Sequence, residues 1–164
     1  MAKRAWIKAA AYHEAGHAVA AFEHGIRLID VSIMPDWEGD SFGRVLVDGK
    51  RFCRVWGPKK RQAALLHLLA GFAAESKYRG RRNWVGAERD IEHARRLTPQ
   101  LRAVEPVATA YLLYIIARAD AFVAQPRIWA GIEALATELL AREELSGTEA
   151  IETIVKGMNA LEAV

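Results

Sequence analysis

Residues 5–24 read AWIKAAAYHEAGHAVAAFEH, an alanine-rich stretch with neither proline nor a strand-like alternation. Alanine has the highest helix propensity, and Gly25 follows at the point where a helix would end. The stretch therefore predicts one long helix. Ala15 and Gly16 in its middle are small and would leave room for packing.

Two short strand patterns follow this helix. Residues 27–34 alternate β-branched with polar side chains and stop at Pro35, and residues 42–47 form a second short run. The segment between them, residues 36–40, is rich in turn-forming residues. The two runs therefore predict a β-hairpin next to the first helix.

The rest of the chain has helical patterns separated by breaks that contain proline or glycine. The expected helices cover residues 58–77, 87–97, 105–124, 126–144 and 149–158. Residues 145–147 are expected to be a break, after which Thr148 caps the last helix. The fold class is therefore mainly α, with a small hairpin or sheet beside the first helix.

The composition fits one domain over residues 1–164, because 52% of the side chains are hydrophobic and the chain is long enough for a real core. We expect a first part over about residues 1–100 and a C-terminal helical part over about residues 101–164. The longest apolar stretch, residues 107–117, ends at Arg118 and is too short for a transmembrane segment, so we expect none.

The cellular setting is inferred from cysteine usage and from the N-terminus. Cys53 is the one cysteine of the chain, so an internal disulfide is excluded. The N-terminus lacks the apolar core of a secretory signal. A reducing, cytoplasmic localisation is the simplest interpretation.

Basic side chains are concentrated in the middle of the chain. Residues 44–82 hold 11 basic and 2 acidic side chains, while the whole chain has a net charge of +3. Such a region could attract nucleic acid, anionic lipid or an acidic protein. A solvated loop and helix face explains it more simply, and no aromatic-and-basic nucleic-acid motif accompanies it. We therefore expect no nucleic-acid partner.

The first helix carries the motif His13-Glu14-Ala15-Gly16-His17. Two histidines four residues apart lie on one helix face, close enough to share a metal ion. A zinc ion lowers the pKa of a bound water towards about 7, and Glu14 is placed to take the proton of that water. This is the His-Glu-x-x-His arrangement of zinc proteases. The alternative is a chance arrangement on a helix that binds no metal.

A zinc site of this type needs a third protein ligand. His24 shares the helix face of His17 but lies about 10 Å further along the helix, so we interpret it as a helix-end residue that favours the dipole. Glu38 falls in the expected turn. The remaining candidate acids are Glu75, Glu88, Asp90 and Glu92.

Several separated segments, in the same order over about residues 10–155, resemble the peptidase domain of the FtsH-type ATP-dependent zinc metalloproteases. They are HEAGHA at 13–18, VSIMP at 31–35, GRV at 43–45, LAGFAAE at 69–75, GAERDIEHA at 86–94, ALATELL at 134–140 and LSGTEAI at 145–151. Ordered matches at several places are more specific than the first motif alone.

The resemblance implies that Asp90 is the third zinc ligand and that Glu75 orients a ligand imidazole. It also implies that a polypeptide substrate binds as an added strand along one sheet edge. The residues of that edge are Gly43, Arg44, Val45 and Leu46. Ordinary roles are the alternatives: Asp90 also suits the first turn of a helix, Glu75 a solvent-facing position, and the edge an ordinary sheet edge. His93 is a rival ligand.

The chain departs from this family in lacking a G-x-x-x-x-G-K-[ST] phosphate-binding loop and a membrane anchor. Substrates would then be short peptides, unfolded segments or flexible loops, unless a separate ATPase partner unfolds them. Glu88-Arg89 replaces small polar residues of the family beside the expected ligand. The family also forms homo-oligomers, which is a possible state here.

We therefore expect a zinc metalloendopeptidase. One alternative is a regulatory or binding module that keeps the zinc site without proteolysis. Another is a nucleic-acid or membrane adaptor that uses the basic region.

Overall fold

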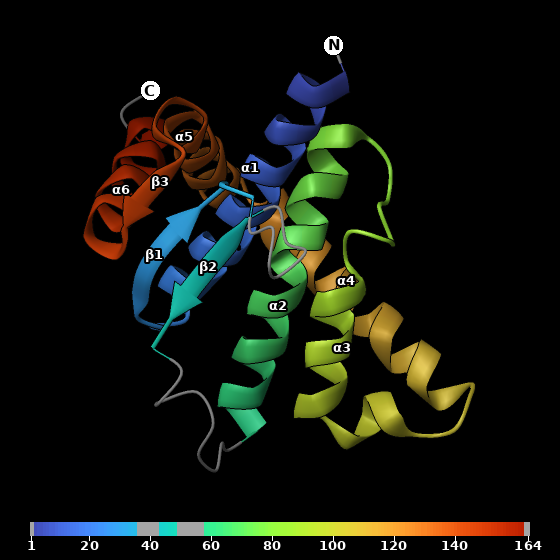
Figure 1. Ribbon diagram of the computed structural model, residues 1–164. Helices are drawn as coiled ribbons and strands as arrows, with labels where there is room; N and C mark the ends of the chain where they lie inside the picture. Colours follow the sequence, from blue (N-terminus) through green and yellow to red (C-terminus); the bar gives the residue numbers. More distant parts are fainter. Residues whose placement is uncertain (1, 36–42, 49–57, 163–164) are drawn as a thin grey trace.

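The computed structural model describes residues 2–35, 43–48 and 58–162 (Figure 1). Its helices are α1 (Ala2–Glu23), α2 (Pro58–Arg79), α3 (Glu88–Leu97), α4 (Val107–Ala124), α5 (Pro126–Arg142) and α6 (Gly147–Glu162), with a short 3-10 helix, η1 (Pro99–Arg102). Its strands are β1 (Leu28–Ser32), β2 (Arg44–Val47) and β3 (Glu144–Ser146). The expected mainly α fold with a small sheet is confirmed, and every expected helix is present with its ends shifted by a few residues.

Helices α1 and α2 lie side by side in the middle of the molecule, with the sheet on one side of α1 and α3 on the far side of α2 (Figure 1). The two helices approach closely because small residues line their contact. A Cβ atom built on Gly16 would lie 2.5 Å from the carbonyl oxygen of Ala70 and 2.7 Å from the Cβ atom of Ala74. Ala70 and Ala74, which face Gly16, are fully buried.

The sheet has the strand order β2-β1-β3, and both neighbours run antiparallel to β1. The expected pairing of the first two strands is confirmed, with Val31 opposite Val45. The expected break at residues 145–147 is wrong in part, because Leu145 lies opposite Val31 as the middle of a third strand. Leu145 is 1% exposed, so burial of this side chain stabilises a strand too short to show a pattern.

The last helix begins earlier than expected, and Thr148 does not cap it. Ser146 is the cap, because its Oγ atom accepts from the backbone amide of Glu149 at 3.4 Å. The carboxylate of Glu149 accepts in return from the amide of Ser146 at 2.9 Å. This reciprocal pair is a capping box, in which the Ser-x-x-Glu spacing satisfies two backbone donors.

Helix α4 is long and apolar enough to cross a membrane by length and composition alone, with a mean hydropathy of 1.5 and 28% of it buried. The same composition occurs in core helices of proteins that do not span membranes. Its buried residues are Ile115, Ile116, Ala119, Phe122 and Val123. The absence of a transmembrane segment therefore stays a prediction.

Some features expected from the sequence lie outside the described residues. This applies to the turn at residues 36–40 with Glu38, to Phe42 at the start of the second expected strand, to Cys53, and to residues 49–57 of the basic region.

Candidate metal centre

Side chains of α1 and α3 converge on one point. His13 and His17, one helical turn apart on α1, direct their Nε2 atoms at Oδ2 of Asp90 in the first turn of α3. The two nitrogen–oxygen distances are 3.1 Å and 3.3 Å. The three residues each offer one ligand atom, and these atoms lie within 4.8 Å of one another.

This donor set fits a divalent metal ion. In a tetrahedral site with bonds of about 2.0–2.1 Å, neighbouring ligand atoms lie about 3.3 Å apart. The observed distances from Asp90 to the two imidazoles are close to that separation. Two imidazoles and one carboxylate also leave a fourth position open for water or substrate.

The other nitrogen of each imidazole is held by a buried acceptor. Nδ1 of His13 lies 3.1 Å from Oε2 of Glu75, and Nδ1 of His17 donates to the carbonyl oxygen of His67 at 2.7 Å. Hydrogen bonds of this kind fix the tautomer, so the Nε2 atoms are available to a metal. The structure thus brings Glu75 to His13, and Glu75 is 4% exposed rather than solvent-facing.

Glu75 is itself held by two donors. Its Oε1 atom accepts from Arg79 at 2.7 Å and from Nδ2 of Asn83 at 2.9 Å. Burial raises the pKa of Glu75, but the hydrogen bonds from His13, Asn83 and Arg79 outweigh burial and lower the pKa below its ordinary value. Glu75 is therefore a carboxylate, as an acceptor for an imidazole N–H must be.

Without a metal ion, protons balance the charge of this cluster. Burial lowers the pKa of His13, but hydrogen bonds to Asp90 and Glu75 outweigh it and raise the pKa above its ordinary value. Burial likewise lowers the pKa of His17, but the charge of Asp90 and the hydrogen bond to it together outweigh burial and raise the pKa above its ordinary value. The two imidazoles hold the pKa of Asp90 well below its usual range, although burial acts to raise it. A bound metal ion would take over this role from the protons.

Glu14 lies next to the start of β2. It is 8% exposed, and burial is the main cause that raises its pKa above the ordinary value. A Cβ atom built on Gly43 would lie 2.6 Å from Oε1 of Glu14, so the absence of a side chain at Gly43 lets the backbone pass close to this carboxyl group. A carboxyl group with a raised pKa is suited to accept and return a proton.

His67 and Gly71 on α2 also shape the site, and the sequence analysis missed them. The Nδ1 atom of buried His67 lies 2.9 Å from the carbonyl oxygen of His17, to which it donates. Burial, followed by the charge on His17, lowers the pKa of His67 to about 4, so it is neutral. A Cβ atom on Gly71 would overlap the His17 ring. His67 and Gly71 are four residues apart and so lie on one helix face, a spacing that could have indicated that both contact the same side chain.

The other candidates lie away from the ligand group. His24 Nδ1 is hydrogen-bonded to the carbonyl oxygen of Ala20 at 2.8 Å, which confirms its interpretation as a helix-end residue. The rival ligand His93 is exposed, as are Glu88 and Glu92. Among the described residues, the group that could hold a metal contains only the two motif histidines and Asp90.

The outer edge of β2 is unpaired by any strand within residues 2–35, 43–48 and 58–162. Arg44 on this strand binds Asp30 at 3.0 Å and Glu144 at 2.9 Å, which ties the three strands together. Leu46 is 46% exposed, whereas Val45 packs against the core. The edge thus begins beside Glu14, and substrate binding along it stays a prediction.

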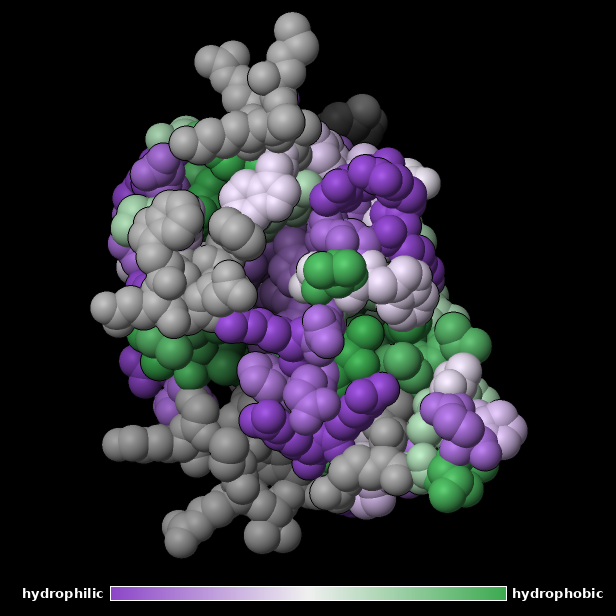
Figure 2. Space-filling model, turned by 45° about the vertical axis from the view of Figure 1, so that its right-hand side comes forward, coloured by the Kyte–Doolittle hydropathy of each residue, from purple (hydrophilic) through white to green (hydrophobic). Residues whose placement is uncertain are grey.

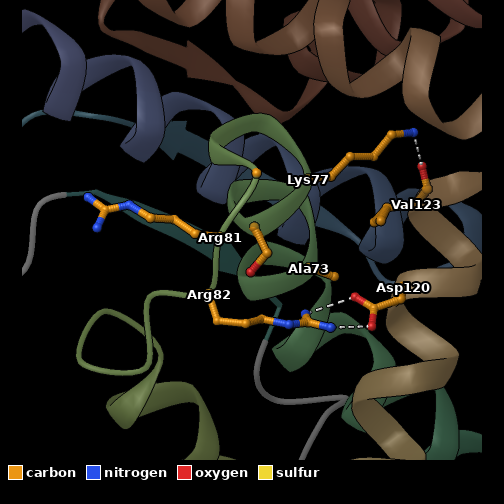
Figure 3. Close-up of a pocket in the computed structure, with 8 residues that line it drawn as sticks. Ala73, Lys77, Arg81, Arg82, Asp120 and Val123 are labelled. Atoms are coloured by element: carbon orange, nitrogen blue, oxygen red, sulfur yellow. Dashed lines mark hydrogen bonds and ion pairs between the residues drawn. The ribbon is translucent and has the colours of Figure 1, made fainter.

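The molecular surface in Figure 2 is hollowed near its middle, and the residues seen at the bottom of the hollow are hydrophilic. A separate cavity of about 430 Å³ lies between the end of α2, the following loop and α4 (Figure 3). Two of its cations are already engaged, because Arg82 binds Asp120 through both nitrogens and Lys77 donates to the carbonyl of Val123. None of the candidate catalytic or ligand residues lines this cavity.

A scan against models of known protein families finds no match for this chain, and a search of curated proteins finds none either. The resemblance to the FtsH-type peptidases therefore depends on the quoted segments alone.

Proposed function

We propose that the protein is a zinc-dependent metallopeptidase, of the FtsH-like type, that hydrolyses peptide bonds in unfolded or flexible polypeptides. The observation that carries the proposal is the convergence of His13, His17 and Asp90 on one point, with Glu14 on the same helix. A third ligand must lie beside both histidines, and the carboxylate of Asp90 lies within 3.3 Å of the second one.

The roles of the residues follow from their contacts. A zinc ion held by the three ligands would lower the pKa of a water towards about 7 and polarise the scissile carbonyl group. Glu14 takes the proton of the attacking water and returns it to the leaving amine, for which its raised pKa is suited. Glu75 and the carbonyl of His67 keep the imidazoles in the ligand orientation.

The outer edge of β2, which pairs with no strand among the described residues, is where we propose that the substrate lies. A peptide added as a strand there would bond through its backbone, so the site would accept many sequences. The edge starts at Gly43, against the carboxyl group of Glu14, so such a peptide would pass the proton acceptor. An added strand must be extended, which restricts substrates to unfolded segments or to chains that a separate ATPase unfolds.

The test is cleavage of casein, an unfolded protein, by the full chain. We expect cleavage that a chelator abolishes and that Glu14→Gln slows by about 100-fold or more, the size of a general-base contribution. Glu152→Gln, the same change at an exposed position of α6, is the control and should cleave normally.

Metal analysis completes the test. Two imidazoles with one carboxylate also suit Fe²⁺, so the bound metal must be identified. The expected result is zinc at about one ion per chain. Undiminished cleavage by Glu14→Gln would exclude the proposed mechanism. One bound ion without any cleavage would favour the regulatory or binding module.

A further inference from the structure

The loop between α2 and α3 contains a side chain that the mechanism has not used. Asn83 lies in this loop, seven residues before Asp90, and is partly buried. Its Nδ2 atom donates to Oε1 of Glu75 at 2.9 Å. Its Oδ1 atom accepts from the backbone amide of Gly86 at 3.2 Å.

These two bonds close a chain of contacts around the metal centre. Glu75 binds the imidazole of His13, Asn83 binds Glu75, and Gly86 stands just before α3, which carries Asp90. Asp90 in turn faces His13. The partner of one ligand is thus joined directly to the segment that delivers another ligand.

The chemistry of this position requires an amide side chain. Oε1 of Glu75 accepts from Arg79 as well as from Asn83, and the Gly86 N–H group only donates. The side chain between them must therefore offer one donor and one acceptor, a few ångströms apart on a short stem. Asn does so, whereas Asp would place a second acceptor against Glu75. The fit is close, because a Cβ atom on Gly86 would overlap the Asn83 amide.

We infer that Asn83 is a positioning residue that sets Asp90 relative to His13 through its bonds to Glu75 and Gly86. The inference rests on the proposed metallopeptidase function and adds to it a residue outside the motif. The hydrogen bonds of Asn83 go to Glu75 and Gly86 and not to a ligand atom, so its effect is on the geometry of the ligand set.

Neighbouring residues provide matched controls. Arg82 anchors the same loop to α4 through Asp120, away from the metal centre (Figure 3). Arg79 donates to the same Glu75 oxygen as Asn83, but from the end of α2 and not from the loop. Arg82→Gln therefore tests loop anchoring alone, and Arg79→Gln tests loss of a Glu75 donor alone.

The experiment is titration of the metal-free full chain with Co²⁺, read by the visible absorption of the bound ion. We expect Asn83→Ala to weaken Co²⁺ binding by about 10–100-fold, as loss of an outer partner does, and to change the absorption spectrum. Asn83→Asp, which has the same shape, should do the same and serves if the alanine variant folds poorly. Arg82→Gln should keep the wild-type spectrum, and Arg79→Gln, which removes a Glu75 donor but leaves the bond to Gly86, should change the spectrum less than Asn83→Ala.

A second measurement separates this inference from the proposed function. In the metal-free protein, amide hydrogen exchange of residues 86–91 should be faster in Asn83→Ala than in Arg79→Gln. If the wild-type chain binds no Co²⁺, the proposed function fails, yet faster exchange at residues 86–91 still supports the role of Asn83. Wild-type Co²⁺ binding by both Asn83 variants, or equal exchange rates in Asn83→Ala and Arg79→Gln, would overturn the inference.

Discussion

Helix pair α1–α2 and helix α3 both supply residues to the candidate metal centre, but they are held in the protein very differently. The pair is packed through glycine and alanine, so its backbones lie close together and its site residues, His17 and Glu75, are buried. In α3, all of whose residues are described, Ala94 is the one buried residue. Most of the other α3 side chains are charged and exposed.

This difference indicates a division of roles. The imidazoles of His13 and His17 are oriented by α2 before any ion arrives. Asp90 is delivered by an element with little buried apolar surface, so its position depends on polar contacts with the imidazoles and through the preceding loop. A metal ion would therefore stabilise α3 far more than it would change α1 or α2.

The largest effect is expected from removing the ligand that α3 contributes. Asp90→Asn keeps the shape of the side chain but loses the charge that a divalent ion needs. We expect zinc affinity to fall by more than about 100-fold, beyond the range for loss of an outer partner. Competition titration with a chromophoric chelator measures this loss. Glu92→Gln, two residues away and exposed, is the control, and equal affinities for both variants would remove Asp90 from the ligand set.

The next effect concerns the tightly packed pair. Gly→Ala inside a helix usually stabilises by about 1 kcal/mol, but Gly16→Ala would place its Cβ atom 2.5 Å from the backbone of Ala70. We expect the free energy of unfolding to fall by about 1–3 kcal/mol, as overpacking does. Denaturant titration measures it. At Gly131 in α5 the nearest atom is the terminal methyl carbon of the flexible Met158 side chain, 3.0 Å away, so Gly131→Ala should cost less. A stabilised Gly16→Ala would contradict the close packing of α1 on α2.

The sequence predicted the helices and the central motif because both depend on local patterns. A long alanine-rich run and a four-residue histidine spacing are set by helix geometry alone. The capping box at Ser146 was equally visible as Ser-x-x-Glu, but Thr148 was preferred for the cap. Strand β3 was missed because a run of three residues shows no alternation, and the buried partner of Leu145 on β1 is more than a hundred residues away.

The candidate site could be predicted only in part for the same reason. The positions proposed for Asp90 and Glu75 came from resemblance, since no spacing rule links residue 13 to residue 75 or 90. His67 carries no specific sequence signal of its own, because a histidine within an apolar helix indicates packing as readily as function. Its reciprocal bonds with His17 exist only because two helices meet at these residues.

A smaller effect is expected from pH. Rising pH should lower the stability of the metal-free protein but increase the stabilisation that zinc adds. In the metal-free protein the pKa values of His13 and His17 are raised, so their contribution to stability is full below their ordinary pKa near 6.5 and is lost as pH rises. The raised pKa of Glu14 acts in the same direction. Because the pKa of Asp90 is lowered, its carboxylate contributes to stability above about pH 4, and this contribution is lost in acid.

We therefore expect the metal-free protein to be most stable near pH 4–6.5 and to lose on the order of 1 kcal/mol or more towards pH 9. Zinc competes with the same protons, so the stabilisation that it adds should grow over that pH range. Thermal unfolding from pH 5 to 9, with and without zinc, measures both trends. Asp90→Asn should flatten the dependence of metal-free stability on pH. If the stability of the metal-free wild-type protein rose from pH 6 to 9, this would contradict the ion pairs of Asp90 with His13 and His17.

The smallest effect is local to α3 and tests the division of roles directly. Without metal, amides of α3 should exchange with solvent at least about tenfold faster than those of the α1–α2 contact, because little apolar surface resists its opening. Zinc should slow the α3 amides, since opening α3 would remove Asp90 from the ion. Amides in the last turn of α6 are the control, because fraying there leaves the metal centre intact. If α3 exchanged as slowly as α1 before zinc was added, α3 would be as firmly fixed as the helix pair, and Asp90 would need no metal to hold it in place.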